Sequence, residues 1–162
     1  MYKHRTFIGL DLATTAGIAV WIPEEGTARA YTTTGNPIRQ LEFLHRRVFD
    51  NSLIEPIIIG IEQLDCFRNA KTVRSLLERI GYFRYSLTAT RLFDVVEVRL
   101  SPTRKYYGFK DKMEVLKFFQ KYTKTPRRLT NDMSDALLIA VWLGHQEDVE
   151  LDDGFEEVIV KP

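Results

Sequence analysis

Runs of apolar residues separated by turn residues predict a sheet that begins near the N-terminus. The segments Thr6–Asp11, Gly17–Ile22 and Thr27–Thr34 are each bounded by turn-forming residues, as in an antiparallel meander. The run Ile57–Ile61 is apolar throughout, which indicates a strand buried on both faces of a sheet. A fifth strand is expected over Phe93–Leu100, where apolar and polar residues alternate.

Apolar side chains that recur at helical spacing predict four helices. The first begins after Asn36, which can cap it ahead of Pro37, and runs to about residue 50. The others are expected over about residues 69–88, 112–122 and 131–144. The apolar side of the second helix comprises Val73, Leu76, Leu77, Ile80 and Phe83.

The order of these elements predicts a single α/β domain. Three strands precede a helix, after which strands and helices alternate. This order fits a mixed five-stranded sheet, an antiparallel meander followed by parallel strands, flanked by helices. A chain of 162 residues is long enough for one core and too short for two. We expect the domain to span residues 1–145 and residues 146–162 to form a loosely held acidic tail.

The pattern does not indicate a membrane protein or a secreted one. No apolar run approaches the roughly 20 residues of a membrane span, and the N-terminus lacks a signal-peptide pattern. The lone cysteine, Cys66, excludes an internal disulfide and suits a reducing compartment. The expected location is therefore the cytoplasm of a bacterium, or of the host if a phage encodes the chain.

The net charge of +1 averages two opposed regions. Residues 99–128 contain ten Lys or Arg and two acids, whereas residues 145–162 contain seven acids and one lysine. Residues 1–144 therefore carry a net charge of +7. A basic body suits a polyanion such as nucleic acid, although an ordinary solvated surface is equally consistent with charge alone.

Acidic residues stand at the ends of two predicted strands. Asp11 ends the first strand, and Glu62 follows the buried run Ile57–Ile61. A carboxylate that leaves a buried strand is costly unless it is paired, protonated or bound to a metal. If the two strands are neighbours, their ends lie about 5 Å apart and the carboxylates converge. Taken alone, Asp11 is better explained as the cap of the turn that follows it.

Two further acids, Asp132 and Asp135, open the last predicted helix. Their i, i+3 spacing puts them on one helical face. Each alone is explained by the helix dipole, which favours acids in the first turn. Asp135 also precedes the apolar stretch Ala136–Ala140, so we expect it near the interior. Four carboxylates at the ends of elements would repel one another and would require Mg²⁺ or Mn²⁺, which prefer oxygen ligands.

Four segments resemble motifs of the RuvC-like Holliday junction resolvases, which belong to the RNase H-like nuclease superfamily. Phe7–Asp11 resembles the opening motif, and Ile61–Gln63 resembles the second. Asp132–Ala140 closely resembles the C-terminal motif. Gly108–Lys112 is similar to the segment in which the family carries a lysine of the catalytic site. The order and approximate spacing of the four motifs are kept.

The resemblance implies an RNase H-like fold and a dimeric endonuclease that nicks symmetrically related strands of a four-way DNA junction. It implies that Asp11, Glu62, Asp132 and Asp135 bind Mg²⁺ or Mn²⁺ and that Lys112 contacts the scissile phosphate. Two ions about 4 Å apart would activate a water molecule and stabilise the leaving oxygen. Lys112 could instead be a solvated lysine at a helix N-terminus.

Basic residues mixed with aromatic ones suit a groove that follows a nucleic-acid backbone. The expected DNA-binding residues are Arg68, Lys71, Arg74, Arg104, Lys105, Lys110 and Lys112. Arg79 could extend this surface. Tyr106, Tyr107 and Phe109 could stack on bases, or they could belong to the core or to a dimer contact.

The resemblance also implies an aromatic wedge shortly after the second motif, which would open the junction. Phe67 and Leu64 are the candidates for it. The neighbouring Asp65 and Cys66 depart from the family pattern, because an acid is unsuited to a loop that faces DNA.

Other functions are compatible with parts of the pattern. An RNase H-like nuclease acting on RNA, or on other branched DNA, would carry the same acids. The segment Asp11–Gly17 also resembles the first phosphate loop of actin-like ATPases and sugar kinases, but the chain is too short for the two domains that those proteins need. A DNA-binding module without catalysis predicts broken acidic motifs, whereas all four acids are present.

Overall fold

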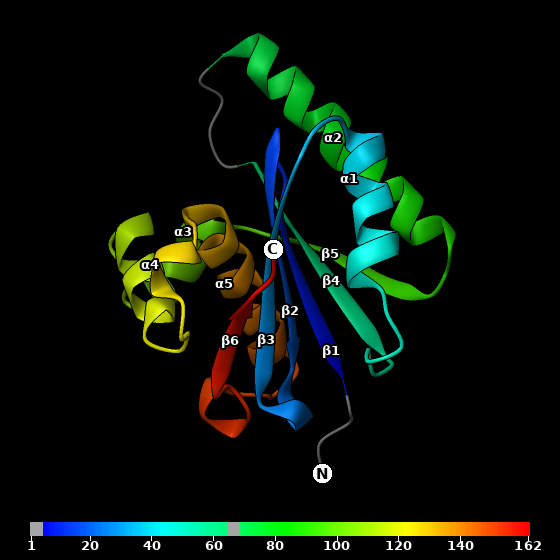
Figure 1. The fold of residues 1–162 in the computed structure, drawn as a ribbon. Coiled ribbons are helices and arrows are strands. Elements are labelled where there is room, and N and C mark those ends of the chain that lie inside the picture. Colours follow the sequence, from blue (N-terminus) through cyan, green and yellow to red (C-terminus); the bar gives the residue numbers. More distant parts are fainter. Residues whose placement is uncertain (1–4, 65–68) are drawn as a thin grey trace.

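A single mixed sheet forms the centre of the computed structural model, which describes residues 5–64 and 69–162 (Figure 1). Its strands lie in the order β5-β4-β1-β2-β3-β6. The strands are β1 (Thr6–Asp11), β2 (Thr15–Ile22), β3 (Thr27–Thr34), β4 (Ile57–Glu62), β5 (Phe93–Val98) and β6 (Glu157–Val160). Pairing is antiparallel for β1–β2 and β2–β3 and parallel for β1–β4, β4–β5 and β3–β6. The predicted meander followed by parallel strands is confirmed, with six strands in place of five.

Helices cover both faces of this sheet. They are α1 (Pro37–Phe43), α2 (Ala70–Ala89), α3 (Leu100–Tyr106), α4 (Lys112–Gln120) and α5 (Asn131–Gln146). A π-helical turn, Leu44–Val48, continues α1, and short 3-10 turns lie at Pro23–Glu25, Pro126–Arg128 and Leu151–Asp153. Figure 1 shows α1 and α2 on one face and α3, α4 and α5 on the other. None of the described helices is long and apolar enough to cross a bilayer.

The alternation of side chains along the strands divides the core into two layers. In β1, Ile8 and Leu10 pack on the side of α1 and α2, with Phe83 and Leu87 of α2. Phe7 faces the opposite side, where most residues of α5 are buried. The helix α5 is therefore the central element of one layer.

The acidic C-terminal segment is not a loosely held tail, and that prediction was wrong. Its last residues form β6, which pairs with β3 along four residues. Phe155 and Val158 are buried in the core, and Trp21 Nε1 donates a hydrogen bond of 2.8 Å to the carbonyl of Gly154. The apolar side chains hold the segment in place, while its carboxylates remain at the surface.

Two element boundaries also differ from the sequence-based prediction. The region between β5 and α4 was expected to be a basic loop, but Leu100–Tyr106 form α3. The final helix continues to Gln146, so Gly144 is not its cap; Gly144 lies within the helix, against the ring of Trp21. The predicted cap of α1 is confirmed, since Asn36 accepts a hydrogen bond from Arg39 N at 2.9 Å.

Two glycines let the backbone of α5 approach the sheet closely. A Cβ atom on Gly9 would lie 1.9 Å from the carbonyl oxygen of Ala136, and one on Gly17 would lie 2.0 Å from that of Asp132. Both distances are far below van der Waals contact, so no other residue fits at either position. The first turn of α5 is thereby held directly over β1 and β2.

Candidate active site

Asp11 and Glu62 leave neighbouring strands at the same end of the sheet. The strands β1 and β4 run parallel, and Leu10 pairs with Ile61, so the next residue of each strand is one of the two acids. The sequence-based expectation depended on these strands being neighbours, and they are. Asp11 is buried, with 7% of its surface exposed, and Glu62 is half-buried.

Both carboxyl groups point to the face that α5 covers. A Cβ atom added to Gly9 would meet the backbone of α5, and one added to Gly60 would meet the side chain of Ile139 in the same helix. Side chains two residues apart share a face of a sheet. Asp11 and Glu62 therefore lie on the α5 side, toward the start of that helix.

The first turn of α5 supplies the other two acids. Thr130 caps the helix by accepting a hydrogen bond from Met133 N at 3.2 Å. Asp132 is half-buried, whereas Asp135 is 1% exposed, which confirms its predicted place near the interior. The close contact of Gly17 with Asp132 fixes the height of this turn above the sheet.

The four acids interact strongly enough to change the protonation of Asp11. Burial, a hydrogen bond with Glu62 and the charges of Glu62, Asp135 and Asp132 together raise the pKa of Asp11 to about 9, and burial is the largest cause. Burial also raises the pKa of Asp132; Lys112 opposes that shift and Asp135 reinforces it. Burial and the nearby acids therefore leave Asp11 protonated at neutral pH.

Two basic side chains surround the buried carboxylate of Asp135. Arg104 Nη2 donates to both of its oxygens at 3.0 Å, and Lys112 Nζ lies 3.5 Å from Oδ2. The Lys112 side chain is 58% exposed, so it reaches both the acid and the solvent. Asp111 caps α4 by accepting a hydrogen bond from Glu114 N at 3.0 Å, which positions Lys112 in the first turn.

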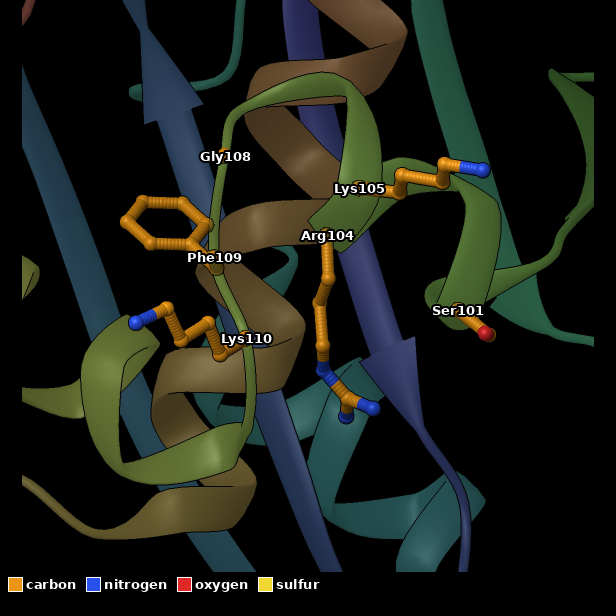
Figure 2. Close-up of a pocket in the computed structure, with 6 residues that line it drawn as sticks. All are labelled: Ser101, Arg104, Lys105, Gly108, Phe109 and Lys110. Carbon is orange, nitrogen blue, oxygen red and sulfur yellow. The ribbon is translucent and has the colours of Figure 1, made fainter.

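A surface pocket of about 380 Å³ lies beside this group. We call it the basic pocket; it is lined by Ser101, Arg104, Lys105, Gly108, Phe109 and Lys110 (Figure 2). Figure 2 shows Arg104 and Lys105 leaving α3 in different directions. The turn at Gly108 has a φ of 78°, a left-handed conformation that suits glycine. Three basic residues thus line a concave surface next to Asp135.

The remaining residues predicted to bind DNA have different surroundings. Lys71 and Arg74 are exposed on the first turns of α2, where Arg74 forms an ion pair with Glu78. Arg68 lies outside the described residues. Arg79 was wrongly assigned to the DNA surface, because it is 7% exposed and donates to Gln40 Oε1 and to the carbonyl of Gly35.

The aromatic residues of the basic region divide between core and surface. Tyr107 and Phe109 pack against the core, whereas Tyr106 is 56% exposed beside Trp142 and His145. Tyr106 is therefore the one of these three that remains free to meet a partner. Of the two wedge candidates, Leu64 is half-buried after β4, and Phe67 lies outside the described residues.

The chemistry of the donor set fits a divalent cation. Four carboxyl groups gather at one end of the sheet, and their mutual repulsion contributes to the raised pKa of Asp11. Hard ions such as Mg²⁺ and Mn²⁺ prefer such oxygen ligands. Within residues 5–64 and 69–162, however, no three His, Cys, Asp or Glu side chains are arranged around a single ion position. The candidate ligands are Asp11, Glu62, Asp132 and Asp135.

Sequence reasoning missed two features of the site. It assigned Arg104 to DNA binding and did not pair it with Asp135, which is 31 residues away in the chain. It also missed Gln40, which is fully buried and donates to the carbonyls of Ala13 and Thr14 at 2.9 and 3.1 Å. Gln40 thus anchors the turn that follows Asp11.

Comparison with solved structures shows the same fold. A structure titled T. thermophilus RuvC in complex with Holliday junction substrate matches with a TM-score of 0.63 and 17% identity, covering 88% of this chain and 96% of that one. A second Thermus thermophilus RuvC structure matches with a TM-score of 0.53 and 18% identity, covering 89% of this chain and 97% of that one. No protein-family model and no curated protein sequence matches the chain. The predicted RNase H-like fold of the RuvC type is confirmed.

Proposed function

We propose that this protein is a divalent-metal-dependent endonuclease that cleaves four-way DNA junctions. The observation that carries the proposal is the gathering of Asp11, Glu62, Asp132 and Asp135 at one end of a RuvC-like fold. The neighbouring structure with a TM-score of 0.63 is itself a complex with a Holliday junction substrate, which supports branched DNA as the substrate class.

The acids would hold Mg²⁺ or Mn²⁺, which when bound supplies an activated water and stabilises charge on the phosphate. Lys112 is suited to the non-bridging oxygens of the scissile phosphate, because its side chain is more than half exposed and its ammonium group lies beside Asp135. Lys105 and Lys110 of the basic pocket would bind an adjacent backbone phosphate. Lys71 and Arg74 would extend this contact along α2.

The experiment is cleavage of a labelled synthetic four-way junction in Mg²⁺, beside matched duplex, flap and RNA substrates. We expect paired symmetric nicks in the junction. Asp11→Asn and Asp135→Asn should each lower the rate by more than about a hundredfold, since losing a ligand costs more than losing a group behind it. Asp94→Asn is the matched control, because Asp94 is an exposed acid on β5 far from this end of the sheet.

The substrates separate the proposal from its rivals. A junction that is bound but left uncut in both Mg²⁺ and Mn²⁺ would contradict the resolvase activity. Cleavage of RNA or of flaps in preference to the junction would instead favour an RNase H-like nuclease with another substrate.

We also propose that the protein acts as a homodimer, which symmetric nicking requires. Support comes from α2, where Leu77, Gly81 and Tyr85 recur every four residues and so share one side of the helix. Leu77 is 51% and Tyr85 78% exposed, although Leu77 was predicted to face the core. A Cβ atom on Gly81 would meet nothing within 4 Å, which leaves room for a second helix to approach. Sedimentation of the protein should give the mass of two chains.

A further inference from the structure

The Asp135 carboxylate is already neutralised by a cation of the chain itself. Arg104 Nη2 donates to Oδ1 and to Oδ2, each at 3.0 Å, and the Asp135 side chain is only 1% exposed. Lys112 adds a second positive charge, 3.5 Å from Oδ2. Both oxygens of this acid are therefore occupied by the guanidinium group.

A metal ion at this position would need the same oxygen lone pairs. A buried carboxylate can be compensated by an arginine or by a divalent ion. A guanidinium that donates to both oxygens takes a lone pair from each, and its positive charge repels a second cation at the same buried acid. The two cations thus compete for Asp135. This step rests on the proposed function, which makes Asp135 a metal ligand.

The basic pocket offers Arg104 an alternative position. Its side chain lines the basic pocket together with Lys105 and Lys110, and 18% of it is exposed. Its Nε is buried and has no hydrogen-bond partner. The guanidinium is therefore incompletely satisfied where it is, and it borders a concave surface that suits an anion (Figure 2).

We infer that Arg104 is a resident counter-ion of Asp135 that a divalent cation displaces, and that the released guanidinium binds a nucleic-acid phosphate in the basic pocket. In the metal-free protein Arg104 compensates the buried charge. When the ion takes the carboxylate, the arginine becomes available to the substrate. Arg104 is thus a positioning residue that couples metal binding to phosphate binding.

The test is Mn²⁺ affinity, measured by calorimetry and by electron paramagnetic resonance on the full chain without DNA. Arg104→Gln should bind Mn²⁺ about tenfold more tightly than Lys105→Gln, because it removes the group that donates to both Asp135 oxygens as well as a charge. Lys105→Gln is the matched control: it removes the same charge from the same helix, and Lys105 is an exposed neighbour that does not contact Asp135.

A second variant and a second readout guard against a folding defect. Arg104→Lys keeps the charge but replaces the guanidinium, whose Nη2 donates to both oxygens, by an ammonium group on a different stem, so its Mn²⁺ affinity should fall between wild type and Arg104→Gln. Without metal, Arg104→Gln should melt at a lower temperature than wild type, since Asp135 loses its main partner. Saturating Mn²⁺ should raise its midpoint more than it raises that of wild type.

The outcomes separate this inference from the proposed function. If wild type binds Mn²⁺ and Asp11→Asn weakens that binding, but Arg104→Gln behaves like Lys105→Gln or binds more weakly, the inference is overturned and the metal site stands. If neither wild type nor any variant binds Mn²⁺, both fail together.

Discussion

At the scale of single residues, the raised pKa of Asp11 makes the stability of the metal-free fold depend on pH. The folded chain holds a proton on this carboxyl, with a pKa of about 9, which an unfolded aspartate releases at about 4. The folded state therefore binds one more proton than the unfolded state between these values. The contribution of Asp11 to the free energy of unfolding is fully present below about pH 4, and it is lost as pH rises toward about 9.

The thermal midpoint of the metal-free protein should consequently fall by several degrees as pH is raised from about 6 to about 8. Asp11→Asn should be more stable than wild type at the higher pH and should show a flatter curve, because the amide cannot ionise. Differential scanning calorimetry in the presence of a chelator measures both. Parallel curves for wild type and Asp11→Asn would contradict the assignment, and Asp94→Asn should leave the slope unchanged.

Sequence alone could predict some of these residues for a local reason. Asp11 and Glu62 each end an apolar run, so their position at the end of a strand could be predicted without knowing the fold. The Arg104–Asp135 pair was not, because it joins two residues that no periodicity relates. The burial of Arg79 and Gln40 could not be predicted for the same reason, because Arg79 of α2 donates a hydrogen bond to Gln40 of α1.

At the scale of elements, long regular segments were predicted and short ones were missed. The strand β1 agrees with its predicted bounds, and α2 and α4 lie within about two residues of theirs. The helix α3 has only seven residues, with Pro102 near its start, and carries too little pattern to identify. The strand β6 has four residues and is stabilised by β3, more than 120 positions earlier in the chain.

The seating of α5 on the sheet leads to a prediction for Gly9. Gly9→Ala would place a methyl group 1.9 Å from the carbonyl oxygen of Ala136 and should destabilise the fold by about 3 kcal/mol, because backbone cannot yield as a side chain can. The control is Ser75→Ala, at an exposed position on another side of α2, where alanine should change stability by less than about 0.5 kcal/mol. Urea unfolding followed by circular dichroism measures both variants. Equal effects at the two sites would contradict the close contact.

At the scale of the whole molecule, the proposed dimer makes the exposed side of α2 a functional surface. Each chain carries one acidic site, and nicking two strands of a junction needs two sites held at a fixed separation. The exposed side chains of Leu77 and Tyr85 would otherwise form a solvated apolar stripe, whereas most other large apolar side chains in the described part of the chain are buried or half-buried.

Leu77→Glu should convert the protein to a single chain at micromolar concentration and turn paired nicks into unpaired ones, because it puts a charge in the contact. Light scattering coupled to gel filtration gives the mass. Ser75→Glu is the control: it adds the same charge to an exposed position on a different side of α2. A Leu77→Glu protein that keeps the mass of two chains would exclude this face as the interface.

The close contact of Gly9 and Gly17 with α5 also affects how the site responds to rising temperature. The backbone of α5 packs directly on the backbone of the sheet there. No side chain lies between them whose change of rotamer would let the helix move away from the sheet gradually. The spacing between Asp11 and the acids of α5 should stay constant as temperature increases. The cleavage rate should then increase with temperature up to the melting transition. It should be lost at that transition in one step, without an earlier gradual decline.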